Sequence, residues 1–410
     1  MQICICRVRV KEWIKISDLL FFQEGPGVRN TQYTQSGVKL LNVANLVNGK
    51  VDLSTSDRYI SEDEAYGRYK HFLCDDGDFI IASSGIKVEY FDRKMGFVDS
   101  SMLPLCMNTS TIRFKVIDSK RLNIKYFMYY LKSIHFKQQL SKFITGSAQL
   151  NFGPSHLKKM NMPLVSLKEQ NDIVEKLSKV ELLLDKYNGE IKLLDELIKA
   201  RFVEMFGTIY DKKFDMKTLP DIVSSDKNSI KRGPFGGALK KEDFLEDGYM
   251  VYEQRHAIHE DFKYAKYYVS PEKYESMIGF KVVPGDLIIS CSGTLGRIAE
   301  VPMGAKEGII NQALLKISLN KDIMNNQFFI YQFRCKEIQD MLFGISRGSG
   351  IANMPSMNEV KTFKFICPPL ELQNQFASFV KEIDKSRSRI QKSLEASQEL
   401  FDSLMQEYFG

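Results

Sequence analysis

Two corresponding loops of the sequence carry side chains suited to contact a polyanion. Each loop directly follows an apolar run, 79–82 in the first case and 287–289 in the second. The glycines of the loops permit close backbone approach, their hydroxyls can donate to phosphate or base edges, and an arginine can contact guanine through two hydrogen bonds. The candidate side chains are Ser83, Ser84 and Lys87 in the first loop and Ser292, Thr294 and Arg297 in the second. A plain strand-to-turn connection remains the alternative for both.

A second pair of loops, at 145–149 and 347–350, combines small residues with amide, hydroxyl and guanidinium groups. Such loops suit contact with a nucleic-acid backbone, although they equally serve as exits into a linker. The segment Gly233-Pro234-Phe235-Gly236-Gly237 is predicted to be a turn, with a DNA-contacting loop as the alternative. The further candidates for DNA contact are Asn108, Thr109, Lys142, Thr145, Ser147, Gln149, Arg232, Asn311, Gln312, Arg347 and Ser349.

Signatures of catalysis are absent from the sequence. There is no phosphate loop of the G-x-x-x-x-G-K-[ST] type, no nucleophile elbow, no H-E-x-x-H and no N-P-P-[YF] tetrapeptide or glycine-rich loop for S-adenosylmethionine. His256 and His259 with Glu260 are too common a spacing to indicate a metal ligand set. We therefore expect no catalytic residues, no cofactor and no metal, and any chemistry falls to a partner.

Composition restricts the class of protein. A chain of 410 residues with 44% hydrophobic residues holds two or three folding units with proper cores. No apolar run approaches the ~20 residues that span a bilayer, and Arg7 and Arg9 interrupt any signal-like segment, so we expect no membrane partner and a cytoplasmic location. The seven scattered cysteines indicate reduced, structural thiols.

The distribution of charge is more informative than the net value of +6. Residues 101–150 contain eight basic residues and a single acidic residue, Asp118. So uneven a segment is a candidate phosphate-facing surface, with an ordinary solvated basic face as the alternative.

The sequence is duplicated. The segment 167–171 matches 370–374, and Met205-Phe206-Gly207 matches the final three residues, both at an offset of 203. Within the halves the offset drifts to 208, where Gly25-Pro26 pairs with Gly233-Pro234, and it returns to 203 at Asn108 and Asn311. The intervening parts have diverged by insertion, while the segments that follow them keep their length.

The segments of constant length carry a heptad pattern. Apolar residues recur at alternating spacings of four and three from Ile173 to Ile198, and from Phe376 to Tyr408 with Arg387 and Ser397 as interruptions. Because those interruptions would weaken a homodimeric coil, each helix is expected to pair with the other. Each helix of about 38 residues would be on the order of 57 Å long. A hairpin buried inside one domain is the less favoured alternative.

The parts between the helices indicate an α+β fold. Short β-branched and aromatic runs at 78–81, 111–114 and 314–317 alternate with turns, and helical stretches follow at about 123–142 and 325–343. We expect two pseudo-repeated mixed α/β domains, at 1–152 and 213–353, joined by two long antiparallel coiled-coil helices within 153–212 and 354–410.

These motifs, in this order and twice over, resemble the specificity subunits of type I restriction-modification systems. The first half has G-D-F-I-I-A-S-S-G, T-G-S-A-Q-L-N-F and L-K-E-Q-N before its helix, and the second has G-D-L-I-I-S-C-S-G, R-G-S-G-I-A-N-M and L-E-L-Q-N. The L-x-E-Q segment is the most specific part, although Leu372 stands where the family has glutamate.

The resemblance implies two target-recognition domains, each reading one half of a split site in double-stranded DNA. It also implies two adenine methyltransferase subunits docked on the helices, and translocating nuclease subunits that join for restriction. The subunit itself would be non-catalytic. A scaffold that uses its coils to bind other proteins without reading DNA is the alternative, because the heptads require a helical partner while no loop by itself requires DNA.

Overall fold

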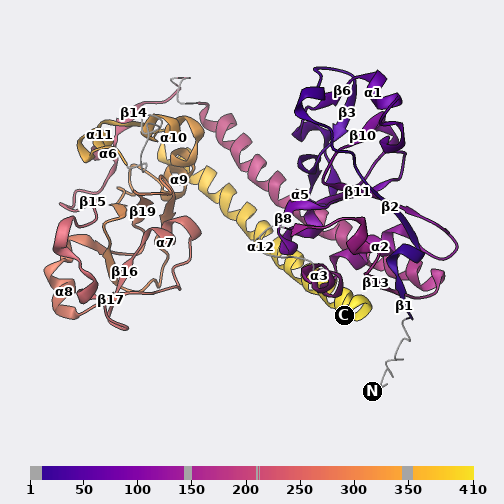
Figure 1. Cartoon of the computed structure of the whole chain (residues 1–410). Coiled ribbons are helices and arrows are strands. Elements are labelled where there is room, and N and C mark those ends of the chain that lie inside the picture. Colours follow the sequence, from indigo (N-terminus) through magenta and orange to yellow (C-terminus); the bar gives the residue numbers. More distant parts are fainter. Residues whose placement is uncertain (1–11, 143–149, 209–210, 212, 344–353) are drawn as a thin grey trace. The chain divides into compact units, whose positions relative to one another are not determined.

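The computed structural model describes residues 12–142, 150–208, 211, 213–343 and 354–410, and the chain divides into two compact units (Figure 1). Unit 1 contains residues 1–188 and 392–410, and unit 2 contains residues 189–391. Each unit therefore takes a part of both long helices. The division predicted from sequence, at residues 152, 212 and 353, separates globular from helical segments instead.

Unit 1 is built on two small sheets. The first has the order β2-β11-β7-β9 and is antiparallel throughout, and the second has the order β10-β3-β6. Their bounds are β2 (Leu20–Glu24), β11 (Thr111–Val116), β7 (Phe79–Ala82), β9 (Met95–Phe97), β10 (Leu105–Met107), β3 (Val38–Leu41) and β6 (Tyr59–Ile60). Two-stranded pairs complete the unit: β1 (Glu12–Lys15) with β13 (Asn161–Leu164), β4 (Leu46–Val47) with β5 (Lys50–Val51), and β8 (Ser84–Ile86) with β12 (Leu150–Asn151).

The helices of unit 1 follow the sheets. They are α1 (Glu62–Tyr66), α2 (Ile124–Lys132), α3 (Ile134–Ser141), α4 (Pro154–Leu157), the first half of α5 (Leu167–Phe206) and the second half of α12 (Leu370–Phe409). The helix predicted at about 123–142 is interrupted at Ser133, whose extended backbone ends α2 and whose Oγ accepts a hydrogen bond from the Phe136 amide to begin α3.

Unit 2 repeats this plan, which confirms the predicted duplication and the mixed α and β fold. Its first sheet has the order β15-β22-β19-β20 and its second β17-β16-β21-β18. The strands are β14 (Met216–Thr218), β15 (Ile230–Arg232), β16 (Tyr249–Tyr252), β17 (Tyr268–Val269), β18 (Lys281–Val282), β19 (Leu287–Ser290), β20 (Ile298–Glu300), β21 (Gly308–Ile310), β22 (Leu314–Ile317) and β23 (Lys364–Ile366), the last paired with β14. The helices are the second half of α5, α6 (Leu219–Ile222), α7 (Gln254–His259), α8 (Pro271–Ser276), α9 (Asn326–Arg334), α10 (Lys336–Phe343), α11 (Met357–Thr362) and the first half of α12 (Leu370–Phe409).

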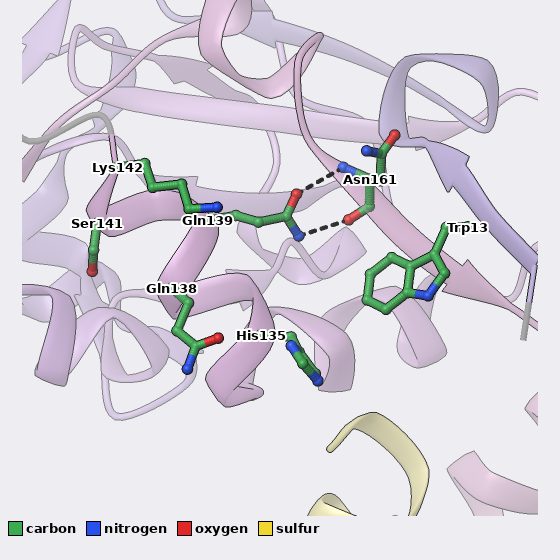
Figure 2. A pocket seen from close by; sticks show the side chains of 7 residues that line it. All are labelled: Trp13, His135, Gln138, Gln139, Ser141, Lys142 and Asn161. Atoms are coloured by element: carbon green, nitrogen blue, oxygen red, sulfur yellow. Dashed lines mark hydrogen bonds between the residues drawn. The ribbon is translucent and has the colours of Figure 1, made fainter.

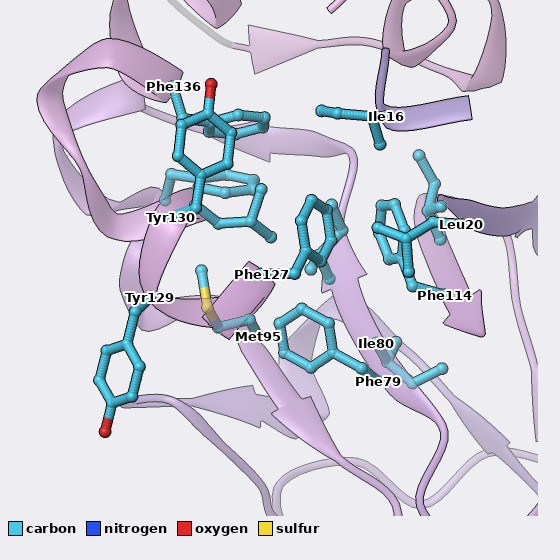
Figure 3. Packing of buried hydrophobic residues seen from close by; sticks show 14 of the residues in the cluster. Ile16, Leu20, Phe79, Ile80, Met95, Phe114, Phe127, Tyr129, Tyr130 and Phe136 are labelled. Atoms are coloured by element: carbon cyan, nitrogen blue, oxygen red, sulfur yellow. The ribbon is translucent and has the colours of Figure 1, made fainter. Parts of the chain in front are cut away.

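Aromatic side chains fill the core of unit 1. Phe127 of α2 lies against the central strands, with its ring centroid 5.0 Å from that of Phe114 and 6.3 Å from that of Phe79 (Figure 3). Every residue of β7 is buried, so the apolar run that the sequence shows at 79–82 is the centre of the sheet. The candidate loops lie where β7 ends and where β11 begins, next to this core.

The heptad positions of the two long helices face each other within both units. In unit 1, Ile173 and Leu177 near the start of α5 share a core with Tyr408 at the end of α12. In unit 2, Phe202 near the end of α5 packs edge-on against Phe376 near the start of α12, at 5.4 Å between ring centroids. The two helices therefore run in opposite directions, as predicted. Among the described helices, none is both long enough and apolar enough to cross a bilayer.

Candidate nucleic-acid interface

Three loops of unit 1 meet where its central strands end. The Ser83 amide donates to the Ser110 carbonyl at 2.8 Å, and the Gly25 amide donates to the Thr111 carbonyl at 2.9 Å. The Asn108 amide reaches the Leu41 carbonyl at 3.1 Å, which brings in the turn that follows β3. We call this cluster, residues 25–27, 42–45, 83–87 and 108–110, the unit 1 edge.

Unit 2 forms the same cluster with the same backbone bonds. The Cys291 amide donates to the Ala313 carbonyl and the Gly233 amide to the Leu314 carbonyl, both at 2.8 Å, while the Asn311 amide donates to the Tyr252 carbonyl at 2.9 Å. We call residues 232–235, 253–256, 290–297 and 311–312 the unit 2 edge. Each unit therefore presents one set of loops held on a rigid sheet, an arrangement suited to recognition.

A glycine at each edge allows two backbones to touch. A Cβ atom on Gly25 would lie 2.0 Å from the Asn108 carbonyl oxygen, and one on Gly233 would lie 1.8 Å from the Asn311 carbonyl oxygen. Any other residue would push these loops apart. The Gly-Pro pairs that the duplication search found are therefore structural members of the edges.

The candidate residues of the unit 1 edge divide into positioning and exposed groups. Asn108 is buried, and its Nδ2 donates to Asn42 Oδ1 at 2.7 Å. Ser83 is buried with its Oγ unpartnered, and Ser84 is half-buried. Lys87 and Thr109 are exposed. Asn108 and Ser83 therefore shape the loops, whereas the side chains of Lys87 and Thr109 are accessible to a ligand.

Lys142 lies outside this cluster, at the end of α3. It lines a pocket of about 560 Å³ together with Trp13 and His135 (Figure 2). Gln139 holds the wall of this pocket, because its side-chain amide exchanges two hydrogen bonds of 2.9 Å with the backbone of Asn161. The structure therefore groups Lys142 with the β1-β13 pair and not with the edge loops.

At the unit 2 edge, hydrogen bonds to Ser290 close the loop that carries the exposed side chain of Arg297. Ser290 Oγ accepts from the Arg297 amide at 3.0 Å and donates to the Thr294 carbonyl at 2.5 Å, and the Ser290 amide donates to the Arg297 carbonyl at 2.8 Å. The Arg297 side chain is exposed and lines a pocket of about 440 Å³ with Glu260 and Arg334. The sequence did not single out Ser290, whose role depends on this closed loop.

The other candidates of unit 2 also lie at its edge. Thr294 and Gln312 are exposed, and Ser292 and Arg232 are half-buried. Asn311 is half-buried as well, and its Oδ1 accepts from the Ala313 amide at 3.0 Å.

The second loop pair lies largely outside the described residues, which include none of Thr145, Ser147, Gln149, Arg347 and Ser349. The described residues that follow these loops do reach the edges. The Phe152 amide donates to the Ser83 carbonyl at 3.0 Å, and the Met354 amide donates to the Cys291 carbonyl at 3.2 Å.

The basic run at 101–150 is less available to phosphate than its composition suggests. Arg113 is buried, with its guanidinium 3.2 Å from Asp78 and 2.7 Å from the Leu73 carbonyl. Lys137 pairs with Asp92 at 3.1 Å. Lys115 and Lys132 also pair with acids, Asp75 and Glu181 respectively. Four of the eight cations are thus neutralised by acids from other segments of the chain.

The glutamine of the L-x-E-Q segment is a structural anchor in both copies. Gln373 is fully buried, and its Nε2 donates to the carbonyls of Ile323, at 3.0 Å, and Pro368, at 2.8 Å. Its Oε1 accepts from the Asn325 amide at 2.8 Å. Gln170 makes the matching three bonds, to Arg121, Val165 and Asn123, all at 2.9 Å. The most specific motif of the sequence therefore fixes the start of each long helix.

Three thiols and one imidazole are buried groups with structural roles. Burial raises the pKa of Cys74, Cys106 and Cys291 to about 12, so these thiols stay protonated near neutral pH. His256 is buried, with Nδ1 accepting from the Glu253 amide at 2.8 Å and Nε2 donating to the Tyr264 carbonyl at 2.8 Å. Over the described ranges no group of three metal-ligating side chains comes together.

The fold and its edges define a duplicated α+β protein, in which two loop-bearing units share a pair of antiparallel helices. The chain belongs to the family of type I restriction modification DNA specificity domains, whose sequence pattern matches it twice, at residues 11–194 and 212–398.

Relatives with assigned names are similar to parts of the chain. The type I restriction enzyme MjaVIII specificity subunit of Methanocaldococcus jannaschii is 25% identical over 42% of this chain. The putative MjaX specificity subunit of the same organism is 24% identical over 65% of this chain. The matched regions span 40% and 64% of the lengths of these two relatives.

Two solved structures share the fold. The S subunit of a type I restriction-modification system from M. genitalium aligns with a TM-score of 0.56 at 17% identity, and 98% of this chain and 97% of that chain are covered. A chain from a structural study of complex assembly in a type I restriction-modification system aligns with a TM-score of 0.50 at 14% identity, with 97% of each chain covered.

Proposed function

We propose that this chain is the DNA-reading specificity subunit of a type I restriction-modification complex. Each unit reads one half of a split site in double-stranded DNA, and partner subunits methylate adenine within that site or cleave DNA. The observation that carries this proposal is the duplicated edge, because two sets of exposed polar loops are held by the same backbone bonds in both units. In this proposal the subunit itself is non-catalytic, and its partner subunits carry out the chemistry.

Two reading surfaces multiply discrimination. One mismatched base pair costs about 1 to 3 kcal/mol, and contributions from well-separated positions add. A single small edge touches few base pairs, so two edges connected by helices reach a selectivity that neither has alone. In this proposal residues 1–152 and 213–353 are the target-recognition domains, and 153–212 and 354–410 are the helical spacers.

The outer faces of the helices supply the surface for protein partners. Leu182, Leu193 and Val203 of α5 are 70%, 63% and 53% exposed, whereas the heptad positions beside them are buried or half-buried. Contiguous exposed apolar groups mark protein–protein contact surfaces, and on α5 the neighbouring residues Leu182 and Leu183, and Leu193 and Leu197 one helical turn apart, are exposed. We assign these helices to the docking of two adenine methyltransferase subunits, with translocating nuclease subunits joining for restriction. Because its target is cellular DNA, we place the complex in the cytoplasm.

The test is to co-express the chain with the methyltransferase subunit of its own genomic neighbourhood and to map methylated adenines by long-read sequencing. The expected result is a motif of two short half-sites with a fixed gap. A complex that forms and methylates no motif would contradict the proposal.

The scaffold alternative makes a different prediction for purified protein. Binding of labelled duplex that weakens steeply as salt increases would indicate phosphate contacts, since neutralised phosphates release counterions. Absence of duplex binding, together with intact methyltransferase binding, would favour a scaffold.

A further inference from the structure

Buried polar atoms without a partner gather at the two edges. Among the described residues, five buried side-chain atoms lack a hydrogen-bond partner, and four of them belong to Ser83, Arg232, Gln254 and Arg255. The fifth, Arg113 Nε, belongs to a guanidinium that is otherwise bonded. Because unpaired buried polar groups are costly and rare in native proteins, their concentration at one kind of site calls for a reason.

Gln254 and Arg255 were not among the residues that the sequence indicated. They begin α7, two and three residues after Tyr252, whose carbonyl accepts the Asn311 amide at the unit 2 edge. Both side chains are half-buried, with Oε1 of Gln254 and Nε of Arg255 covered. Within the described part of the chain, neither side chain has a hydrogen bond or an ion pair. No intramolecular network therefore uses their remaining donors and acceptors.

The guanidinium of Arg255 is held in a fixed plane. Its Cζ lies 3.2 Å from the centroid of the Tyr264 ring, and the Tyr264 backbone is in turn held by the 2.8 Å bond from His256 Nε2. Stacking on an aromatic face leaves the in-plane N–H donors of arginine directed outward. An arginine organised in this way loses little entropy when it binds a planar pair of acceptors.

The same turn in unit 1 shows that the fold does not need these two residues. There the Asn42 amide donates to Asn45 Oδ1 at 2.9 Å, as the Glu253 amide donates to His256 Nδ1 in unit 2. The positions between the capping residues are Val43 and Ala44 in unit 1 and Gln254 and Arg255 in unit 2. The polar pair is thus a feature of unit 2 that the turn itself does not require.

We propose that Arg255 reads a base edge in the major groove and selects a guanine in the half-site of unit 2, and that the Nε2 of Gln254 donates to an acceptor of a neighbouring base, since its Oε1 is covered. Arginine pairs with guanine O6 and N7 through two hydrogen bonds, which the two Nη groups of Arg255 can supply while its Nε stays covered. Unit 1, with Val43 and Ala44 at this turn, reads its half-site through other residues. The inference rests on the proposed function, since it names determinants of that recognition.

The test uses the complex with its methyltransferase partner and two variants of unit 2. The double variant Gln254→Val, Arg255→Ala introduces the residues that stand at the same turn in unit 1, Val43 and Ala44. Because that turn forms in unit 1, we expect it to form in the variant as well. Arg255→Lys keeps the charge but loses the planar fork that pairs with guanine. Lys361→Ala, at an exposed position of α11, is the control for loss of a cation in unit 2.

The expected result is that the methylation motif of the double variant becomes degenerate in one half-site while the other half-site and the gap stay as in the wild type. For Arg255→Lys, the preference of the purified complex for an intact over a base-substituted half-site falls by about 5- to 150-fold, the value of one lost bidentate pair. The salt dependence of binding stays the same, since the charge is retained.

The outcomes separate the two proposals. Absence of a split motif in the wild type would contradict the proposed function itself. A wild-type split motif that is unchanged in the double variant would overturn the base-reading role of this pair. If the double variant binds matched and base-substituted duplexes with equally reduced affinity and a shallower salt dependence, the base-reading role is also overturned. Arg255 would then be a phosphate contact.

Discussion

Replacement of Gln373 by alanine tests the anchor at the start of α12. The substitution removes three hydrogen bonds, to the carbonyls of Ile323 and Pro368 and from the amide of Asn325, at a side chain that is fully buried. Each such bond contributes about 1 kcal/mol net, and the backbone groups left behind inside the protein would have no other partner. We therefore expect a loss of about 3 kcal/mol in the free energy of unfolding.

The assay is thermal and urea unfolding of the wild type and the variant, followed by circular dichroism. Unit 2 spans residues 189–391, and for a domain of this size each kcal/mol lowers the midpoint by about 2 to 4 °C. The expected shift is therefore about 6 to 12 °C. Gln375→Ala is the matched control, because Gln375 lies two residues further along the same helix and is exposed.

The reasoning would be refuted by a Gln373→Ala variant that unfolds with the same midpoint as Gln375→Ala. A second readout separates anchoring from recognition. Below the unfolding transition, the complex with Gln373→Ala should methylate the wild-type motif, since Gln373 lies away from the edge loops. A changed motif would mean that the glutamine takes part in reading DNA.

Three further predictions concern the edges and the helices. Gly25→Ala should destabilise unit 1 by about 1 to 3 kcal/mol, because the new Cβ would lie 2.0 Å from the Asn108 carbonyl oxygen. The control Gly27→Ala, whose Cβ would have no atom within 4 Å, should change the stability little, and equal urea midpoints for the two variants would contradict the prediction. Arg297→Ala should relax selectivity in one half-site more than it lowers general affinity, measured on specific and random duplexes, and equal losses would remove its reading role. Deletion of one heptad from α5 and α12 together should change the gap of the methylated motif, and an unchanged gap would exclude the helices as the spacer.

Much of the fold could be predicted because it depends on local pattern and repetition. The offset of 203 residues identified two copies of one unit, and the structure repeats the four-stranded sheet and the β10-β3-β6 arrangement, to which unit 2 adds β18. Continuous apolar runs at 79–82 and 287–289 are buried central strands. The heptad positions of α5 and α12 are buried or half-buried, including the interrupting Arg387, which pairs with Asp195 at 2.5 Å. Turns and caps such as Ser133 shifted the boundaries, since they depend on single hydrogen bonds.

The sequence indicated loops that the structure places at the two edges, but not which of their residues are buried and which are exposed. Ser83 and Asn108 looked like ligand-facing residues and are buried, while Gln254 and Arg255 carried no motif and lie at the unit 2 edge. Their only sequence signal is the contrast with Val43 and Ala44. That contrast becomes visible only when the turns are aligned through their capping bonds, because the offset has drifted there.

The sequence by itself determined the duplication, the α and β elements, the paired helices and the family. The tertiary structure decided which polar residues face solvent and which hold the protein together. Arg113 and Gln373 are alike in this respect, because each is bonded to groups 35 to 50 residues away in the chain. Contacts of that kind leave no periodicity in the sequence. They depend on which strand ends and helix starts the core brings together, and so does the set of loops at each edge.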